Sequence, residues 1–154
     1  MGKRLQNRSA HPAPLGRHTL FVVPCTKKKI WEAEPHAPKY VAAREAYKGH
    51  TMTRWLQSRW HKADALWVIL SAKYGFIDPD QPISNYDVTF HDDCTGPLSA
   101  DSLRAQIECQ RRGRNRWRLG DIRRVRVWGD DDLYFDIVKY AFSRTSVQVT
   151  RMPT

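Results

Sequence analysis

The chain has few cysteines and no long apolar run, and both shortages exclude classes of protein. Its 154 residues include three cysteines, Cys25, Cys94 and Cys109, without CxxC spacing, so neither a disulfide framework nor a zinc site is predicted. No stretch is apolar enough to cross a bilayer, and the first residues lack the apolar core of a signal peptide. We therefore expect a cytoplasmic protein with no membrane partner and no evident obligate protein partner.

Acidic residues are scarce overall but concentrated in one segment. The chain has 26 Lys and Arg against 16 Asp and Glu, a net charge of +10, which predicts attraction to nucleic acid. Residues 1–17 contain four basic and no acidic residues, and we interpret them as a flexible basic arm before a single domain at 18–154. Residues 74–103 contain six Asp and no Lys or Arg, which predicts an acidic pocket with basic flanks. The alternative to nucleic-acid binding is a solvated basic surface without a specific ligand.

Short apolar runs alternate with helical patterns along the chain. Residues 19–23 and 66–70 are predicted to be buried strands. Between them, apolar residues at 41–62 recur mostly at helical spacing and predict one or two crossover helices, with Gly49 as a possible break. The second half predicts a helix from Ser99 or Asp101 to Arg111, a strand at 123–127, a helix at 133–142 and a strand at 146–150. The fold class is therefore α/β, a single small domain with a mostly parallel sheet flanked by helices.

Polar residues follow the predicted strand at 66–70 abruptly, as in a site at the carboxyl end of a strand in an open α/β sheet. The candidate residues of this loop are Ser71, Lys73, Tyr74, Gly75, Asn85, Tyr86 and Asp87. Asp78 and Asp80 flank Pro79 and are expected to form a turn. Asp87 is the candidate catalytic carboxylate, able to align water or stabilise a cationic sugar, with structural capping as the alternative.

The other polar residues of this loop have two interpretations each. Lys73 can bind phosphate or, if desolvated, form a Schiff base, and the phosphate role is favoured. Tyr74, Tyr86 and the earlier Tyr47 can stack on a base, or can be core aromatics with satisfied hydroxyls.

The exit of the first strand is a second candidate site. Residues 25–29 follow Pro24, and their backbone amides and three lysines can bind phosphate, with a solvated lysine turn as the alternative. The residues chosen from this segment are Cys25, Lys27 and Lys28. Cys25 as a nucleophile would need a partnered His, which the sequence does not identify. Residues 91–94 (His-Asp-Asp-Cys) lack a second ligand cluster at metal spacing. We therefore predict no metal and no cofactor.

Arginine is concentrated between residues 104 and 126, where nine Arg accompany Trp117. Such density with an interleaved aromatic predicts contacts to a nucleic-acid backbone. The alternative is that residues 104–126 form a surface helix and loop that contact no nucleic acid. The residues chosen as DNA-backbone contacts are Arg111, Arg112, Arg114, Arg116 and Arg118.

Three sequence motifs carry a resemblance to known proteins. They are Pro24-Cys25-x-Lys27-Lys28-x-x-Trp31, Ala42-x-x-x-Ala46-Tyr47-x-Gly49, and Leu70-Ser71-Ala72-Lys73-Tyr74-Gly75 with Pro79, Ile83, Tyr86 and Asp87. Together they resemble a small bacterial and phage domain family of unknown function. The part from Tyr74 to Tyr86 is also similar to the YaaA peroxide-stress proteins, which bind DNA. YaaA proteins carry an Arg after the tyrosine equivalent to Tyr86, where this chain has Asp87.

The chain also resembles anti-phage DNA glycosylases that remove glucosylated hydroxymethylcytosine from viral DNA. This resemblance implies a monofunctional N-glycosylase that binds double-stranded DNA with modified bases, extrudes the base and leaves an abasic site. A non-enzymatic, YaaA-like DNA-binding protein is the alternative. A third hypothesis is an enzyme of free nucleotides or tRNA, with residues 27–29 holding a terminal phosphate.

Overall fold

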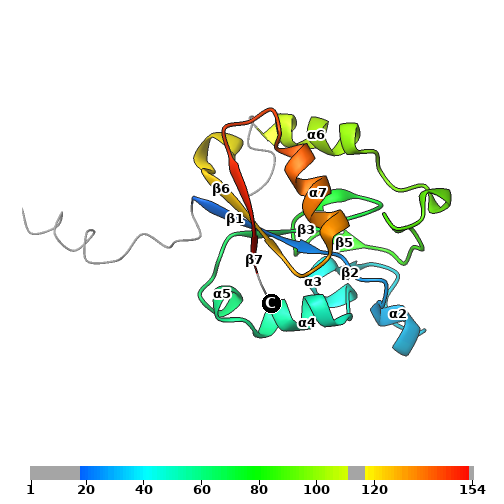
Figure 1. Cartoon of the computed structure of the whole chain (residues 1–154). Coiled ribbons are helices and arrows are strands. Elements are labelled where there is room, and N and C mark those ends of the chain that lie inside the picture. The colour runs from blue at the N-terminus through cyan, green and yellow to red at the C-terminus, as the bar shows by residue number, and fades with distance from the viewer. Residues whose placement is uncertain (1–17, 111–116, 153–154) are drawn as a thin grey trace, which may run out of the picture.

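Every residue of β1 (Thr19–Pro24) is buried, and this strand lies at the centre of a five-stranded sheet of order β4-β3-β1-β6-β7. The structure is a computed structural model that describes residues 18–110 and 117–152. The predicted arm, residues 1–17, lies outside the described residues. Strands β3 (Trp67–Ser71), β6 (Arg124–Trp128) and β7 (Gln148–Met152) continue the parallel sheet around β1, whereas β4 (Gly75–Ile77) is antiparallel to β3. The predicted α/β class with a mostly parallel sheet is confirmed (Figure 1).

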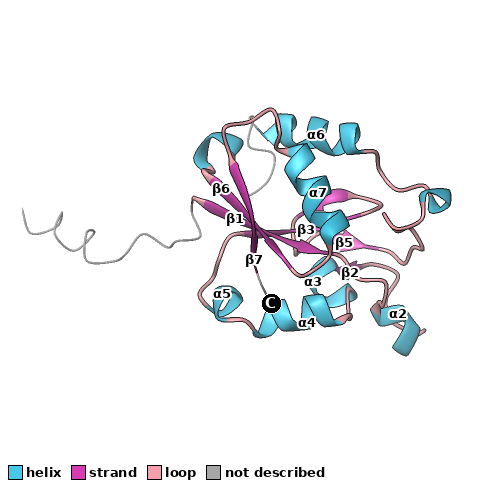
Figure 2. Ribbon diagram, in the orientation of Figure 1, coloured by secondary structure: helices cyan, strands magenta, loops and turns pink. Residues whose placement is uncertain are grey.

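Helices cover both faces of the sheet (Figure 2) because successive residues of β1 point to opposite sides. Leu20 and Val22 pack in one apolar cluster with α6 (Ala100–Cys109) and α7 (Asp132–Ala141). Phe21 and Val23 pack in the other with α3 (Ala43–Ala46) and α4 (His50–Gln57). Each fully buried aliphatic or aromatic side chain stabilises the fold by roughly 1.5–3 kcal/mol.

The strand order reverses direction at β1. From β1 the chain moves to β3 and β4 on one side, and it later adds β6 and β7 on the other. In open α/β sheets a ligand crevice forms outside the carboxyl ends of the strands at such a reversal. The loops that follow β1, β3 and β6 all leave this carboxyl edge of the sheet, on the right of Figure 1.

The region between β1 and β3 is more divided than the helical spacing predicts. It contains α2 (Ile30–Ala33), the short strand β2 (Val41–Ala42), α3, α4 and α5 (Arg59–Lys62). The break at Gly49 is confirmed, since α4 begins directly after it. The prediction of one or two helices over residues 41–62 was wrong. The segment begins with β2, which pairs with a distant strand. It ends with α5, a separate helix capped by Ser58, whose side chain accepts a hydrogen bond from the His61 amide.

The segment after β3 is not the continuous loop that its Pro and Asp residues predicted. It contains β4 and then β5 (Pro82–Ile83), which pairs antiparallel with β2. These strands are too short for a periodic signal. The expected turn at Asp78 and Asp80 is present, because the Asp80 amide donates to the Asp78 carboxylate at 2.9 Å.

The second half follows its predicted order with shifted boundaries. Ser99 caps α6, accepting from the Ser102 amide, and α6 ends at Cys109 rather than Arg111, which lies outside the described residues. The acidic start of α7 is confirmed, since the Asp131 carboxylate accepts from the Leu133 and Tyr134 amides. The last strand lies two residues later than predicted because its register is set by β6, where Arg124 pairs with Gln148.

A glutamine side chain covers the outer edge of β4. Gln106 of α6 accepts from the Phe76 amide and donates to the Tyr74 carbonyl, both at 3.0 Å. Between these groups lies Gly75, with a φ of +80°, and a Cβ there would lie 2.1–2.5 Å from the Gln106 amide. Gly75 is thus buried beneath Gln106, and the absence of a Cβ lets the Gln106 side chain lie against the backbone of β4.

Gly75→Ala should destabilise the fold more than Gly96→Ala. Both glycines have a φ of +80°, but a Cβ on Gly96 meets nothing within 4 Å, so Gly96→Ala isolates the backbone cost. At position 75 the Gln106 amide must also move and lose two hydrogen bonds, which adds about 1–3 kcal/mol. Thermal unfolding of both variants measures the difference, at about 2–4 °C per kcal/mol. Equal melting temperatures would show that the Gln106 contacts contribute nothing.

Candidate functional site

Residues from five segments meet at the carboxyl edge of the sheet. Cys25 and Lys29 follow β1, Tyr47 ends α3, Ser71 ends β3, and Tyr86 follows β5. Cys25, Tyr47, Ser71 and Tyr86 were chosen from the sequence as site residues, whereas Lys29 was considered only as part of the lysine cluster at 27–29. Their contacts with one another define the candidate site.

The loop after β1 is held by a close contact with the start of α4. The Gly49 amide donates to the Thr26 hydroxyl at 3.0 Å, and that hydroxyl donates to the Lys28 carbonyl at 2.9 Å. A Cβ on Gly49 would lie 2.6 Å from Cβ of Thr26, so only glycine permits this approach. Lys29 and Tyr47 then form an isolated antiparallel bridge, which brings their side chains to the same place.

Three hydroxyls form a directed hydrogen-bond network. The Ser71 hydroxyl accepts from the Lys73 and Tyr74 amides at 3.2 and 3.1 Å, so its own hydrogen is donated to the Tyr86 hydroxyl at 2.9 Å. Tyr86 and Tyr47 share a hydrogen bond of 2.5 Å. That bond uses only one of the two phenol hydrogens.

Lys29 places an ammonium group beneath this network. Its side chain is 5% exposed, its Nζ lies 4.3 Å from the centroid of the Tyr86 ring, and it donates to the Lys27 carbonyl at 3.2 Å. Burial lowers the pKa of Lys29, opposed by the nearby Cys25 and Asp87 side chains. The sequence predicted that the three lysines 27–29 bind phosphate or form a solvated turn, and no local signal separates the third from the other two.

The tyrosines of the site are held as neutral phenols. Burial is the main cause that raises the pKa values of Tyr47, Tyr86 and Tyr134 far above the ordinary 10.0. Tyr134 comes from α7, and its hydroxyl lies 3.2 Å from Sγ of Cys25, which joins the exits of β1 and β6. Neutral phenols donate hydrogen bonds rather than act as bases. The sequence analysis missed Tyr134 because it lies at a helical core position of α7.

Lys73, Tyr74 and Asp87 lie at the rim of the site. Lys73 is exposed, and its Nζ lies 5.2 and 5.6 Å from the ring centroids of Tyr74 and Tyr86. The rings of Tyr74 and Tyr86 are perpendicular, with centroids 5.6 Å apart. Asp87 is exposed and close enough to Lys29 to affect its pKa. Asn85 is also exposed, between Ser84 and Tyr86.

Exposed lysines surround the site. Lys27 and Lys28 follow β1, Lys48 follows α3, and Lys73 follows β3, so four ammonium groups come from loops at the same edge. Arg118 is exposed at the opposite edge, just before η4 (Leu119–Asp121) and β6. The other predicted backbone contacts, Arg111, Arg112, Arg114 and Arg116, lie outside the described residues.

The aspartates of residues 74–103 do not gather into the acidic pocket that their density predicted. Asp80 pairs with Arg44 at 2.9 Å. Asp92 accepts from the Cys94 amide, and Asp101 accepts from the Tyr140 hydroxyl at 2.6 Å. Short polar side chains next to turn residues satisfy local donors first. The acidic residues are therefore dispersed over separate turns and helix ends.

A second polar pair, not chosen from the sequence, lies beside the site. His91 Nε2 is 2.7 Å from an Asp131 carboxylate oxygen, and the His91 ring lies 6.2 Å from that of Tyr134. No group of three or more His, Cys, Asp or Glu residues suited to a metal ion occurs within residues 18–110 and 117–152.

Comparisons with known proteins give one curated relative. The uncharacterized protein YfjM of Bacillus subtilis (strain 168) is 42% identical over 92 residues, which cover 57% of this chain and 58% of YfjM. The matched region is thus less than two thirds of that protein. No family model and no solved structure matches the chain. In the described part of the chain, no helix has the length and apolar character needed to span a membrane.

The buried phenols predict alkaline sensitivity. Because the pKa values of Tyr47, Tyr86 and Tyr134 are raised in the folded state, the unfolded chain releases these protons first as the pH rises. Their contribution to stability is present below pH 10 and falls above it. Phenolate absorbance should therefore rise together with loss of near-ultraviolet circular dichroism.

Tyr86→Phe should reduce this alkaline sensitivity, whereas Tyr40→Phe, at a side chain 60% exposed, should leave it unchanged. Ionisation of all six tyrosines near pH 10 in a protein that is still folded would contradict the prediction.

Proposed function

We propose that this protein is a monofunctional DNA glycosylase, a cytoplasmic enzyme that excises a modified base from phage DNA in anti-phage defence. The proposed base is glucosylated hydroxymethylcytosine, and the product is an abasic site. The observation that carries the proposal is a site of neutral hydroxyl donors over a buried ammonium, within a ring of exposed lysines.

This arrangement suits the charges that develop when an N-glycosyl bond breaks. The electron pair of the bond leaves with the base, so the base becomes negative and the sugar C1′ becomes positive. The phenol network and Lys29 can stabilise the base, because fixed donors in a buried site act strongly on developing negative charge. Asp87, at the rim, can stabilise the cationic sugar and accept a proton from the water that bonds to C1′.

The surrounding lysines fit a nucleic-acid backbone. Lys27, Lys28, Lys48 and Lys73 are exposed around the site, where they can contact phosphates on either side of an extruded nucleotide. Lys73 is assigned to phosphate rather than to a Schiff base because it is exposed, whereas an amine nucleophile needs desolvation. Tyr74 and Tyr86 offer aromatic surface to the base.

A second candidate function, a non-enzymatic YaaA-like DNA-binding protein, is favoured by one observation. Arg118, Arg123 and Arg124 are exposed at the opposite edge of the sheet, about 17 Å away for a strand of five residues. These arginines can bind DNA without engaging the candidate site.

One experiment separates the two functions. Purified protein is incubated with unmodified, hydroxymethylated and glucosylated hydroxymethylated phage DNA, and released bases and abasic sites are quantified. Release of one modified base with an equal number of abasic sites supports the glycosylase. Binding to all three DNAs with no release from any favours the binding protein.

Asp87→Asn should lower the excision rate at least about 100-fold, because the neutral amide can neither accept the proton of water nor stabilise a cation. DNA affinity should change little. Single-turnover excision and a binding titration measure the two effects. Asp136→Asn, at an exposed position of α7, is the matched control. Equal loss of excision and binding in a folded Asp87→Asn protein would refute the catalytic role.

Lys29→Met should lower excision by about 100–1,000-fold, the usual effect of removing one preorganised donor. Stability should be unchanged or higher, since a buried cation is replaced by an apolar chain of similar length. Lys62→Met, on the exposed surface of α5, is the control and should keep full activity. Full excision by Lys29→Met would show that the ammonium only supports the loop.

A further inference from the structure

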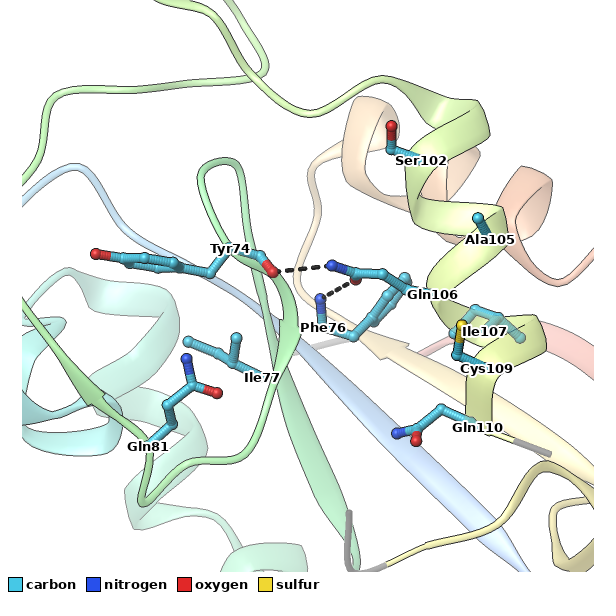
Figure 3. Close-up of a pocket in the computed structure, with 10 residues that line it drawn as sticks. All are labelled: Tyr74, Phe76, Ile77, Gln81, Ser102, Ala105, Gln106, Ile107, Cys109 and Gln110. Carbon is cyan, nitrogen blue, oxygen red and sulfur yellow. Dashed lines mark hydrogen bonds between the residues drawn. The ribbon is translucent and has the colours of Figure 1, made fainter. Parts of the chain in front are cut away.

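A cavity of about 580 Å³ lies between the edge strand β4 and helix α6. This volume is within the roughly 300–1,000 Å³ typical of small-molecule sites. Figure 3 shows side chains of α6 on one side and those of β4 and the following turn on the other. The lining residues are Tyr74, Phe76, Ile77, Gln81, Ser102, Ala105, Gln106, Ile107, Cys109 and Gln110.

Among residues 18–110 and 117–152, the polar side chains that line this cavity carry no charge. Three amides, from Gln81, Gln106 and Gln110, and the Ser102 hydroxyl stand among aromatic and aliphatic side chains. Each amide offers both a donor and an acceptor. This described lining of amides and a hydroxyl suits a neutral ligand rich in hydroxyl groups.

Gln110 supplies an unused hydrogen-bonding group. Its side chain is 5% exposed, and its amide oxygen has no hydrogen-bond partner in the described structure. Figure 3 shows the Gln110 amide extending from α6 toward the cavity. A buried acceptor without a partner costs free energy, so its presence at a cavity points to a donor supplied by a ligand.

An additional β-strand cannot pair with β4 at this cavity. Gln106 already occupies the Phe76 amide and the Tyr74 carbonyl on the outer edge of β4, which an added strand would need. The occupant is therefore not a strand added to β4. Tyr74 lines this cavity and also contacts the Tyr86 ring, so the cavity adjoins the candidate catalytic site.

We infer that this cavity binds the neutral, polyhydroxylated substituent of the modified base, a sugar ring, while the base itself lies against Tyr74 and Tyr86. This inference rests on the proposed glycosylase function and adds to it the place where the sugar is recognised. Gln110 accepts a hydrogen bond from a sugar hydroxyl, and Gln81 and Ser102 are the further polar contacts.

The first test needs no catalysis. Side-chain amide signals of the labelled protein are followed by nuclear magnetic resonance during titration with methyl glucoside and, separately, with the anionic glucuronate. Saturable shifts of the Gln110 and Gln106 amides with the glucoside alone are expected. Gln110→Leu should abolish the shift of the Gln106 amide, Ala105→Trp, which fills the cavity from α6, should abolish both shifts, and Gln57→Leu at the exposed end of α4 should abolish neither. Absence of shifts, or shifts that survive both cavity variants, overturns the inference.

Stability gives an independent readout. Gln110→Leu removes a buried, unpaired acceptor, so its melting temperature should rise while glucoside binding is lost. A fall in melting temperature would show a structural role for Gln110 and overturn the inference.

Excision by the same variants separates this inference from the proposed function. Gln110→Leu should lower kcat/KM for glucosylated DNA about tenfold, the equivalent of one hydrogen bond. Glucoside binding without excision by the unmodified protein would refute the glycosylase and leave the cavity assignment supported. Excision that is unaffected by both cavity variants would refute the cavity assignment alone.

Discussion

The hydrogen bonds that converge on the Ser71 hydroxyl hold the carboxyl edge of the sheet together. This one group, fully buried at the end of β3, accepts from two backbone amides of the following turn and donates to Tyr86. Tyr86 in turn bonds Tyr47 at the end of α3. A central strand, the turn after it, the segment after β5 and a helix on one face of the sheet are thereby tied to one another. An unpaired member of such a buried network would cost about 1–3 kcal/mol, so the four segments are positioned as a unit.

The electrostatics of the site follow from that packing. Burial keeps the phenols neutral and lowers the pKa of Lys29, while Lys27 and Lys28 remain in solvent. The site therefore has a rim of exposed lysines and a buried interior in which neutral hydroxyl donors lie beside the Lys29 ammonium. In the proposed function the rim contacts the phosphates of DNA, and the interior contacts the carbonyl groups of the extruded base. The cavity beside β4 extends this neutral surface through Tyr74.

Much of the fold was predictable because each main element has its own periodic signal. The buried runs of β1 and β3, the order of the later elements and the acidic cap of α7 were read from local residues. The short strands that pair at long range could not be predicted, since β2, β4 and β5 contain only two or three residues each. Lys29 illustrates the same limit within the site. Three consecutive lysines are equivalent in sequence, and only the third, which bridges Tyr47, is buried in the structure.

The sequence by itself determined the α/β class, the carboxyl-edge position of the polar loops and most of the residues that gather there, because strand patterns and turn residues are local properties. Tertiary structure alone decided which of these groups touch. The aspartates that are dense in sequence were separated by their local partners, as with Asp80 and Arg44. Cys25 and Tyr134, 109 residues apart, were brought into contact. Burial, and hence the protonation of the site, depends on segments far apart in the chain, and no short stretch of sequence contains that information.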